Sequence, residues 1–366
     1  MALQRGSKAI SAAHRQGLHM GYTAQILDDI RAQLAPEDAA IKDARQRRES
    51  VRSAALVFRG SRHTFASGSL AHATANCPVH LRDKGLDADC GVVLDRRSYP
   101  SLGPDSVIGD GPNDVVEQVR SFVQGRVIAA YPKVRVTTTK RALLLEFNEP
   151  LPNGEDPTVD LVVGLERSGA RGLWIPNTEA NRWDPSDPEE HTRLLTSEPK
   201  SLRVTRARAI RLAKAENKRA VDPLLCSFNL EALALMFVTQ GMSVPDALVA
   251  LWRDGARDLR TRLTPDPAGV SAPIKCGNRT VAADRLDSAA DRLVSAMAHD
   301  DDESWVRREL AALWPEFVAD SGVGVTKARA LARLKSGASL SVTRTGSLSA
   351  TAGLALKEPR SFGESH

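Results

Sequence analysis

The sequence predicts an α+β protein in which a sheet domain is followed by an all-helical lobe. Between residues 57 and 200, short apolar runs with period-two alternation predominate. After residue 201, apolar residues recur every three to four positions. A chain of 366 residues with 42% apolar content can bury the cores of two such units.

The first part of the chain predicts two helices and then a sheet. The helices are expected at 24–33 and 38–56, with Pro36 between them. Strands are expected at HTFAS, DADCGVVLD, VRVTTTK, RALLLEFN and TVDLVVGLE, and a helix at 113–130 separates the second strand from the third. Antiparallel hairpins are expected near the end of the sheet. Residues 182–200, rich in Pro, Asp and Glu, are expected to connect the lobes.

The second part predicts helices within 203–220, 228–241, 245–263, 280–299 and 302–318. We therefore expect N-terminal helices at 1–56 that pack on both lobes, a catalytic sheet domain at 57–200 and a helical lobe at 201–319. Residues 320–366 are Ser/Gly-rich and are expected to form a flexible basic tail, with one short helix near 327–334.

The net charge of +5 does not by itself indicate nucleic-acid binding, because most of it lies in the tail. Residues 320–366 hold seven basic and three acidic side chains, a net charge of +4, which leaves +1 for residues 1–319. No segment has the ~18 apolar residues of a membrane helix, and the N-terminus lacks the apolar centre of a secretory signal. The four cysteines include no C-x-x-C pair, so we expect free thiols and a cytoplasmic protein.

Two aspartates interrupt an apolar strand in LDADCGVVLD. Asp87 and Asp89 share one face of that strand, since side chains alternate. Asp160 stands in a similar setting in TVDLVVGL, and three carboxylates converge if the two strands are neighbours. Such a triad suits Mg²⁺ or Mn²⁺ and can hold two ions for displacement at phosphorus. Taken alone, D-x-D also fits a strand cap or an edge.

A Gly-Ser pair precedes the two acids. Gly68 lets backbone amides approach a phosphate, and Ser69 adds a hydroxyl donor. The combination GSLAHATANCPV, LDADCGVVL and VDLVV resembles the nucleotidyltransferase pattern of DNA polymerase beta, oligoadenylate synthase and cyclic GMP-AMP synthase. It is most similar to the bacterial cGAS/DncV-like nucleotidyltransferases (CD-NTases). The resemblance implies a polymerase-beta-like sheet domain, an active site in the cleft between the lobes, metal on the three aspartates, and triphosphate on Gly68 and Ser69.

The resemblance continues into the helical lobe. RLAKAENKRAVDPLLCSFNLEALAL is similar to the family's lysine-bearing helix and the serine that opens its next helix. It implies that Lys214 and Ser227 contact the triphosphate. From the residues alone, Lys214 would be a solvated surface charge and Ser227 a helix N-cap.

The segment between the lobes is also similar to the family. In LWIPNTEANRWDPSDPEEH, the likeness implies that Ser186 reaches a bound nucleotide. Trp183 offers a stacking surface, although buried packing is favoured for it. No zinc-ribbon insertion of the kind found in the animal DNA sensor is visible.

The residues and this resemblance together predict a Mg²⁺-dependent nucleotidyltransferase that joins NTPs, ATP and/or GTP, and releases pyrophosphate. The resemblance implies cyclic di- or trinucleotide products in anti-phage defence of the CBASS type. It also implies a regulatory or ubiquitin-transfer-like partner at the tail. Two alternatives stay open: an RNA-tailing transferase, which would need a basic groove, and a non-catalytic nucleotide-binding sensor.

Overall fold

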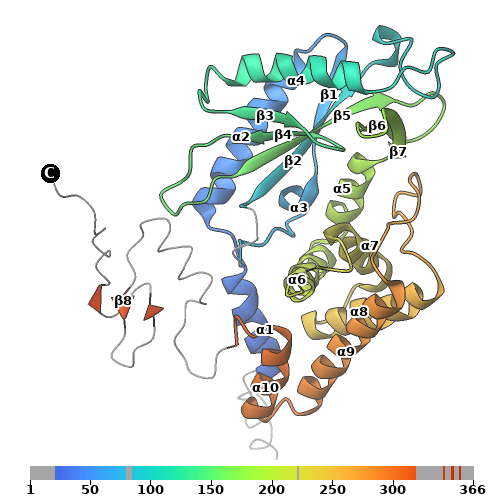
Figure 1. The fold of residues 1–366 in the computed structure, drawn as a ribbon. Helices are drawn as coiled ribbons and strands as arrows, with labels where there is room; N and C mark the ends of the chain where they lie inside the picture. The colour runs from blue at the N-terminus through green and yellow to red at the C-terminus, as the bar shows by residue number, and fades with distance from the viewer. Residues whose placement is uncertain are drawn as a thin grey trace, which may run out of the picture.

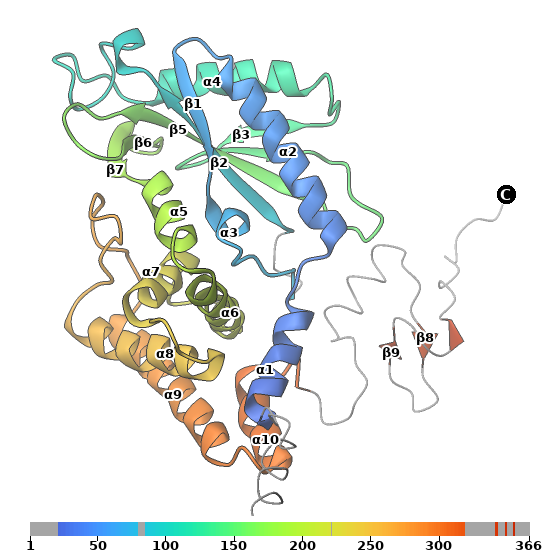
Figure 2. The same cartoon turned by 180° about the vertical axis from the view of Figure 1, so that it is seen from behind.

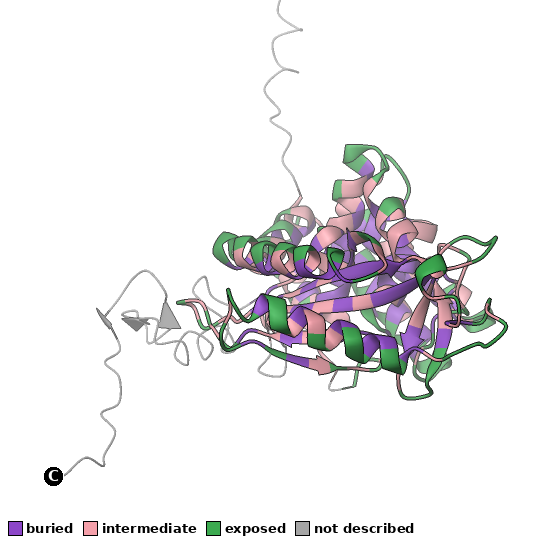
Figure 3. Ribbon diagram, turned by 90° about the horizontal axis from the view of Figure 1, so that it is seen from above, coloured by how far each residue is buried: buried purple, intermediate pink, exposed green. Residues whose placement is uncertain are grey.

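The computed structural model describes residues 21–79, 85–220 and 222–318, together with three two-residue strands further on. Two lobes lie one above the other in Figure 1, a sheet with helices and a bundle of helices. Strands lie in the interior and exposed residues follow the outer sides of the helices (Figure 3). The prediction of an α+β chain with a sheet domain before a helical lobe is confirmed.

The sheet lobe is built on seven strands. Five of them lie in the order β1-β2-β5-β4-β3, and β6 pairs with both β5 and β7. Only β2 and β5 run parallel; the other pairs are antiparallel. The strands are β1 (Ser61–Ala66), β2 (Asp87–Leu94), β3 (Arg135–Thr138), β4 (Leu143–Glu146), β5 (Thr158–Glu166), β6 (Leu173–Asn177) and β7 (Arg182–Ser186).

Helices cover one face of this sheet and leave the other face toward the helical lobe. Alternation along β2 and β5 buries apolar side chains, among them Val92 and Val163, against this helical layer. The helices of the layer are α2 (Asp38–Leu56) and α4 (Asn113–Val127), which contact each other and the sheet (Figure 2). The opposite face carries the aspartates and the short helix α3 (Gly68–Ala71). A 3₁₀ turn, η1 (Arg96–Ser98), follows β2.

The helical lobe packs around a core that includes Trp252 and Trp314, both fully buried. Helix α1 joins this lobe rather than the sheet, because it contacts α6, α8 and α10. The helices of this lobe are α1 (Tyr22–Gln33), α5 (Pro188–Thr196), α6 (Lys200–Asn217), α7 (Ser227–Phe237), α8 (Val244–Thr261), α9 (Arg279–Ala298) and α10 (Glu303–Leu313).

Residues 182–200, the segment expected to connect the lobes, pass from the sheet lobe into the helical lobe. The segment contains strand β7 and helix α5. Its Pro and Asp residues start the helix: the Asp187 side chain accepts from the Glu190 backbone N–H at 3.0 Å, and Pro188 occupies the first turn.

Most of the tail, including the expected helix at 327–334, lies outside the described residues. Three short strands of the tail are described, and they form one antiparallel sheet in the order β10-β8-β9. The sequence did not predict these strands, β8 (Ser341–Val342), β9 (Leu348–Ser349) and β10 (Leu354–Ala355). Within the described part of the chain, no helix has both the length and the apolarity needed to cross a bilayer.

Candidate active site

Parallel pairing of β2 and β5 brings the three predicted aspartates together. Asp89 lies directly opposite Asp160 in the register, and Asp87 lies opposite Thr158. One carboxylate oxygen from each aspartate lies within 4.8 Å of the other two. The Thr158 hydroxyl donates to Asp87 Oδ1 at 2.9 Å and orients that carboxylate. The strand geometry expected from the sequence therefore produces the triad.

The electrostatics of the triad favour a bound cation. Burial raises the pKa of the Asp89 carboxyl well above its usual range, and the charges of Asp87, Asp160 and Glu231 raise it further. A divalent cation would reverse this effect, since it stabilises the ionised carboxylates. Three oxygen donors, all partly exposed, match the preference of Mg²⁺ and Mn²⁺ for carboxylate ligands.

Gly68 is required by the packing of Asp89. A Cβ atom at residue 68 would lie 1.7 Å from Asp89 Oδ2, and the backbone there has φ +73°, which favours glycine. The Ser67 N–H also donates to the Asp89 carbonyl at 3.1 Å. The Gly-Ser turn is therefore built directly onto the acidic strand.

A cavity of about 350 Å³ joins the triad to the helical lobe; we call it the interlobe cavity. Six of the residues predicted to act on nucleotide or metal line it: Gly68, Ser69, Asp87, Asp89, Lys214 and Ser227. The others that line it are Ser67, His72, Pro188, His191, Phe228 and Glu231. Asp160 and Ser186 are not among them. Asp160 clusters with Asp87 and Asp89, whereas Ser186 lies on β7 opposite Leu173, and its nucleotide contact stays a prediction.

Lys214 is not the solvated surface charge that its residue type alone predicts. It is buried, and its Nζ donates to Glu231 Oε1 at 2.6 Å and to Thr74 Oγ1 at 3.0 Å. Ser227 is the first residue of α7 and not its N-cap. Cys226 takes the cap position, where its N–H donates to Asn229 Oδ1 at 3.1 Å. The Ser227 side chain is thus left for the cavity.

Glu231 links the two lobes and was not predicted. Its carboxylate pairs with Lys214 of the helical lobe. It also accepts from Thr74 Oγ1 at 2.7 Å and contacts His72 Nδ1 at 3.2 Å, and these two residues belong to the segment of the sheet lobe that follows α3. Burial alone would raise the pKa of Glu231, but the charges and hydrogen bonds of Lys214 and His72 outweigh it and lower the pKa to about 2. A sequence signal existed, because Glu231 is the only charge in the apolar run of α7 and lies one turn after Ser227.

His191 is a second unpredicted member of the cavity wall. Its Nε2 lies 2.6 Å from Asp266 Oδ1, and the Asp266 carboxylate also accepts from the Val270 and Ser271 backbones. Burial opposes ionisation of Asp266, but those backbone hydrogen bonds and His191 lower its pKa. The ionised carboxylate can only accept, so His191 Nε2 donates and the ring is held by this contact.

Trp183, by contrast, is a packing residue. It is buried in the core of the sheet lobe, and its Nε1 donates to the Asp110 carbonyl at 3.0 Å.

Solved structures of other proteins share this architecture, although sequence comparisons find no match. No family model matches the sequence, and no curated protein matches it. Solved structures do match. Bradyrhizobium diazoefficiens CD-NTase CdnG in complex with GTP has a TM-score of 0.59 and 16% identity over 80% of this chain and 96% of that chain. E. coli MS115-1 CdnC with ATP has a TM-score of 0.59 and 16% identity over 82% and 99% of the two chains. Apo Vibrio cholerae DncV has a TM-score of 0.61 and 12% identity over 82% and 96%.

The chain has the CD-NTase fold. The match includes both lobes, since it covers at least 96% of each of these three proteins. The prediction of a polymerase-beta-like sheet domain followed by a helical lobe, and the resemblance to CD-NTases, are confirmed at the level of structure. Within the CD-NTase fold, the triad and the interlobe cavity lie where the two lobes meet.

Proposed function

We propose that this protein is a Mg²⁺-dependent nucleotidyltransferase that joins NTPs and releases pyrophosphate. One observation supports it most: within the CD-NTase fold, a cluster of three carboxylates of the sheet lobe reaches the interlobe cavity through Asp87 and Asp89, and a buried lysine of the helical lobe lines the same cavity. Opposite charges facing each other across a cleft suit a substrate that carries both metal and phosphate.

Each predicted site residue has a part in the proposed reaction. Asp87, Asp89 and Asp160 would hold two divalent ions, Mg²⁺ or Mn²⁺, which would neutralise phosphate charge and activate the attacking hydroxyl. Ser69, Lys214 and Ser227 are proposed to bind the triphosphate, and Ser186 to contact the nucleotide from β7. Lys214 supplies a positive charge that Glu231 and Thr74 hold in position.

The product is proposed to be a cyclic di- or trinucleotide made from ATP, GTP or both, as a signal in anti-phage defence. Solved structures with this fold support the choice: CdnG is in complex with GTP, CdnC with ATP, and DncV is described as a cyclic AMP-GMP synthase. CdnC also forms a complex with a HORMA protein. A regulatory or ubiquitin-transfer-like protein is the corresponding partner proposed for residues 320–366.

The test is to incubate the purified chain with α-³²P-labelled NTPs, Mg²⁺ and, afterwards, phosphatase. A small labelled product that resists phosphatase is expected, because cyclic phosphodiesters have no terminal phosphate. Label in added RNA would instead identify a tailing enzyme, and no product under any NTP mixture would identify a nucleotide sensor. Asp87→Ala provides the inactive control, and mass spectrometry of the product would identify the bases.

A further inference from the structure

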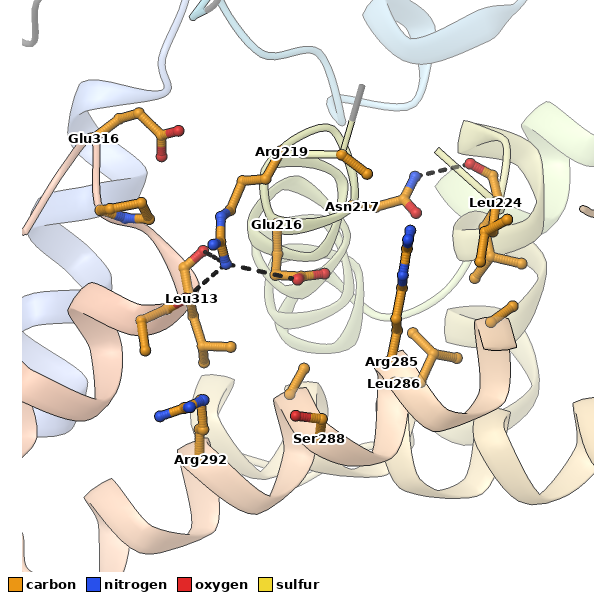
Figure 4. A pocket seen from close by; sticks show the side chains of 16 residues that line it. Glu216, Asn217, Arg219, Leu224, Arg285, Leu286, Ser288, Arg292, Leu313 and Glu316 are labelled. Carbon is orange, nitrogen blue, oxygen red and sulfur yellow. Dashed lines mark hydrogen bonds and ion pairs between the residues drawn. The ribbon is translucent and has the colours of Figure 1, made fainter. Parts of the chain in front are cut away.

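The helical lobe contains a second cavity, of about 480 Å³, that shares no lining residue with the interlobe cavity (Figure 4). Its walls are the last turn of α6, one face of α9, the end of α10 with the residues after it, and four residues that follow α6: Arg219, Ala220, Leu224 and Leu225. A cavity of this volume is in the range that binds small organic molecules. We call it the α6–α9 cavity.

The face of α9 in this cavity is a hollow with an arginine at each end. Arg285 and Arg292 are two turns apart, ~10 Å along the helix axis. Between the two arginines, Ser288 and Ala289 have small side chains, so the surface of α9 is recessed there. Leu286 adds an apolar wall. A ring can lie on such a floor while a charged group reaches one end.

Arg285 carries the charge that is available to a ligand. It is exposed, points from α9 toward the end of α6 (Figure 4), and has no hydrogen-bond partner within the described ranges. Arg219 is different, because its guanidinium donates to the Ala312 and Leu313 carbonyls at 2.6 and 3.1 Å. Arg292 is held by Glu309 at 3.3 Å.

Glu216 adds a hydrogen-bonding group at the inner wall. Burial raises the pKa of Glu216 to about 7, against the opposing charges of Arg219 and Arg285. At neutral pH the lining, with three arginines and the acids Glu216 and Glu316, is therefore positive on balance. Such a site attracts an anion.

We propose that the α6–α9 cavity binds a small organic phosphate of about the size of a nucleoside monophosphate, with its phosphate on Arg285 and its ring against α9. Arginine favours phosphate because its planar fork donates two parallel hydrogen bonds. The binding half of this proposal is independent of the function proposed above.

The wall of the cavity also connects it to the active site. Asn217 Nδ2 donates to the Leu225 carbonyl at 2.7 Å, which fixes the chain just before Cys226 and Ser227. Lys214 lies less than one turn before Glu216 on the same helix. A ligand that orders this wall acts on both Lys214 and Ser227, so its binding alters the affinity of the interlobe cavity for nucleotide. This half rests on the proposed function.

The first test is hydrogen–deuterium exchange of the full chain with 5′-GMP, 5′-AMP or inorganic phosphate, together with binding titrations. A mononucleotide is expected to protect peptides from 216–225 and 282–292, and inorganic phosphate is expected to bind at least tenfold more weakly. Arg285→Ala should weaken mononucleotide binding at least tenfold. Arg279→Ala is the matched control, because it removes an exposed arginine of α9 that does not line the cavity.

Three results would overturn the binding half: no protection by either mononucleotide, protection confined to 67–72 and 227–231, or equal affinity in Arg285→Ala and wild type. Ser288→Trp offers a second variant, since it fills the hollow and should abolish the protection.

For the regulatory half, the affinity for a non-hydrolysable GTP analogue with Mg²⁺ should change about 5- to 150-fold when the cavity is occupied. An unchanged affinity refutes that half, whereas an analogue that does not bind at all counts against the proposed function only.

Discussion

Replacing Glu231 by glutamine should destabilise the fold, although the two side chains have nearly the same shape. The Glu231 carboxylate is buried with Lys214 at 2.6 Å and His72 at 3.2 Å. Glutamine keeps an oxygen that accepts from Thr74 but removes the negative charge. Lys214 would then be a buried cation without a counter-charge, which is costly.

The pKa of Glu231 sets the size of the effect. A decrease from 4.5 to about 2 on folding corresponds to about 3 kcal/mol at neutral pH, since one pKa unit is worth about 1.4 kcal/mol. Breaking a buried ion pair typically costs about 3–5 kcal/mol, which agrees. Because the folded pKa is the lower one, this stabilisation is complete above about pH 5 and is lost as the pH falls toward 2.

The assay is urea unfolding followed by the fluorescence of the five tryptophans, two of which, Trp252 and Trp314, lie in the core of the helical lobe. Glu231→Gln should lower the free energy of unfolding by about 3 kcal/mol at pH 7, and the difference from wild type should shrink below pH 5. Glu303→Gln, which disrupts only the exposed pair with Arg307, should change it by at most about 0.5 kcal/mol. A Glu231→Gln protein as stable as this control at pH 7 would refute the reasoning.

Three further predictions concern the interlobe cavity. Asp89→Ala should abolish product formation and leave the protein folded, as circular dichroism can verify; turnover near that of wild type in Mg²⁺ would remove Asp89 from the metal site. Gly68→Ala should inactivate the enzyme and lower its melting temperature, because the new methyl group would displace the Asp89 carboxylate; normal activity would show that the turn can shift freely. Lys214→Ala and Ser227→Ala should each weaken NTP binding about ten- to a hundredfold, the equivalent of ~1.5–3 kcal/mol, and unchanged titrations for both would leave them without that role.

The triad could be predicted from sequence because a strand has a fixed period. Two acids at i and i+2 in an apolar run must share a face, and Asp160 occupies the same kind of strand. What remained conditional was the pairing of the two strands, which lie about 70 residues apart in the chain. Register between distant strands is decided by packing of the whole sheet, and no local pattern specifies it.

The burial of Lys214 could not be predicted, because its counter-charge comes from another helix. A lysine is buried only where the fold supplies a partner, and Glu231 and Thr74 are distant from it in sequence. The Ser227 cap was misplaced by one residue, since cysteine is an unusual N-cap and serine a common one. Strand β7 and helix α5 were not predicted within 182–200 for a related reason: Asp187-Pro188 is a helix start, but a Pro-rich, acidic composition is also typical of linkers.

The Gly-Ser turn and the D-x-D strand form one structural unit, whatever lies between them in the chain. Strands β1 and β2 are antiparallel neighbours, with Ala66 opposite Cys90, so the residues after Ala66 must lie beside Asp89. This register fixes the distance between the turn and the acids, and the 17 residues between Ser69 and Asp87 do not. Their number can vary without moving the site, whereas residue 68 cannot carry a Cβ atom. Each motif is weak alone, but their hydrogen-bonded contact explains why the pair together is specific.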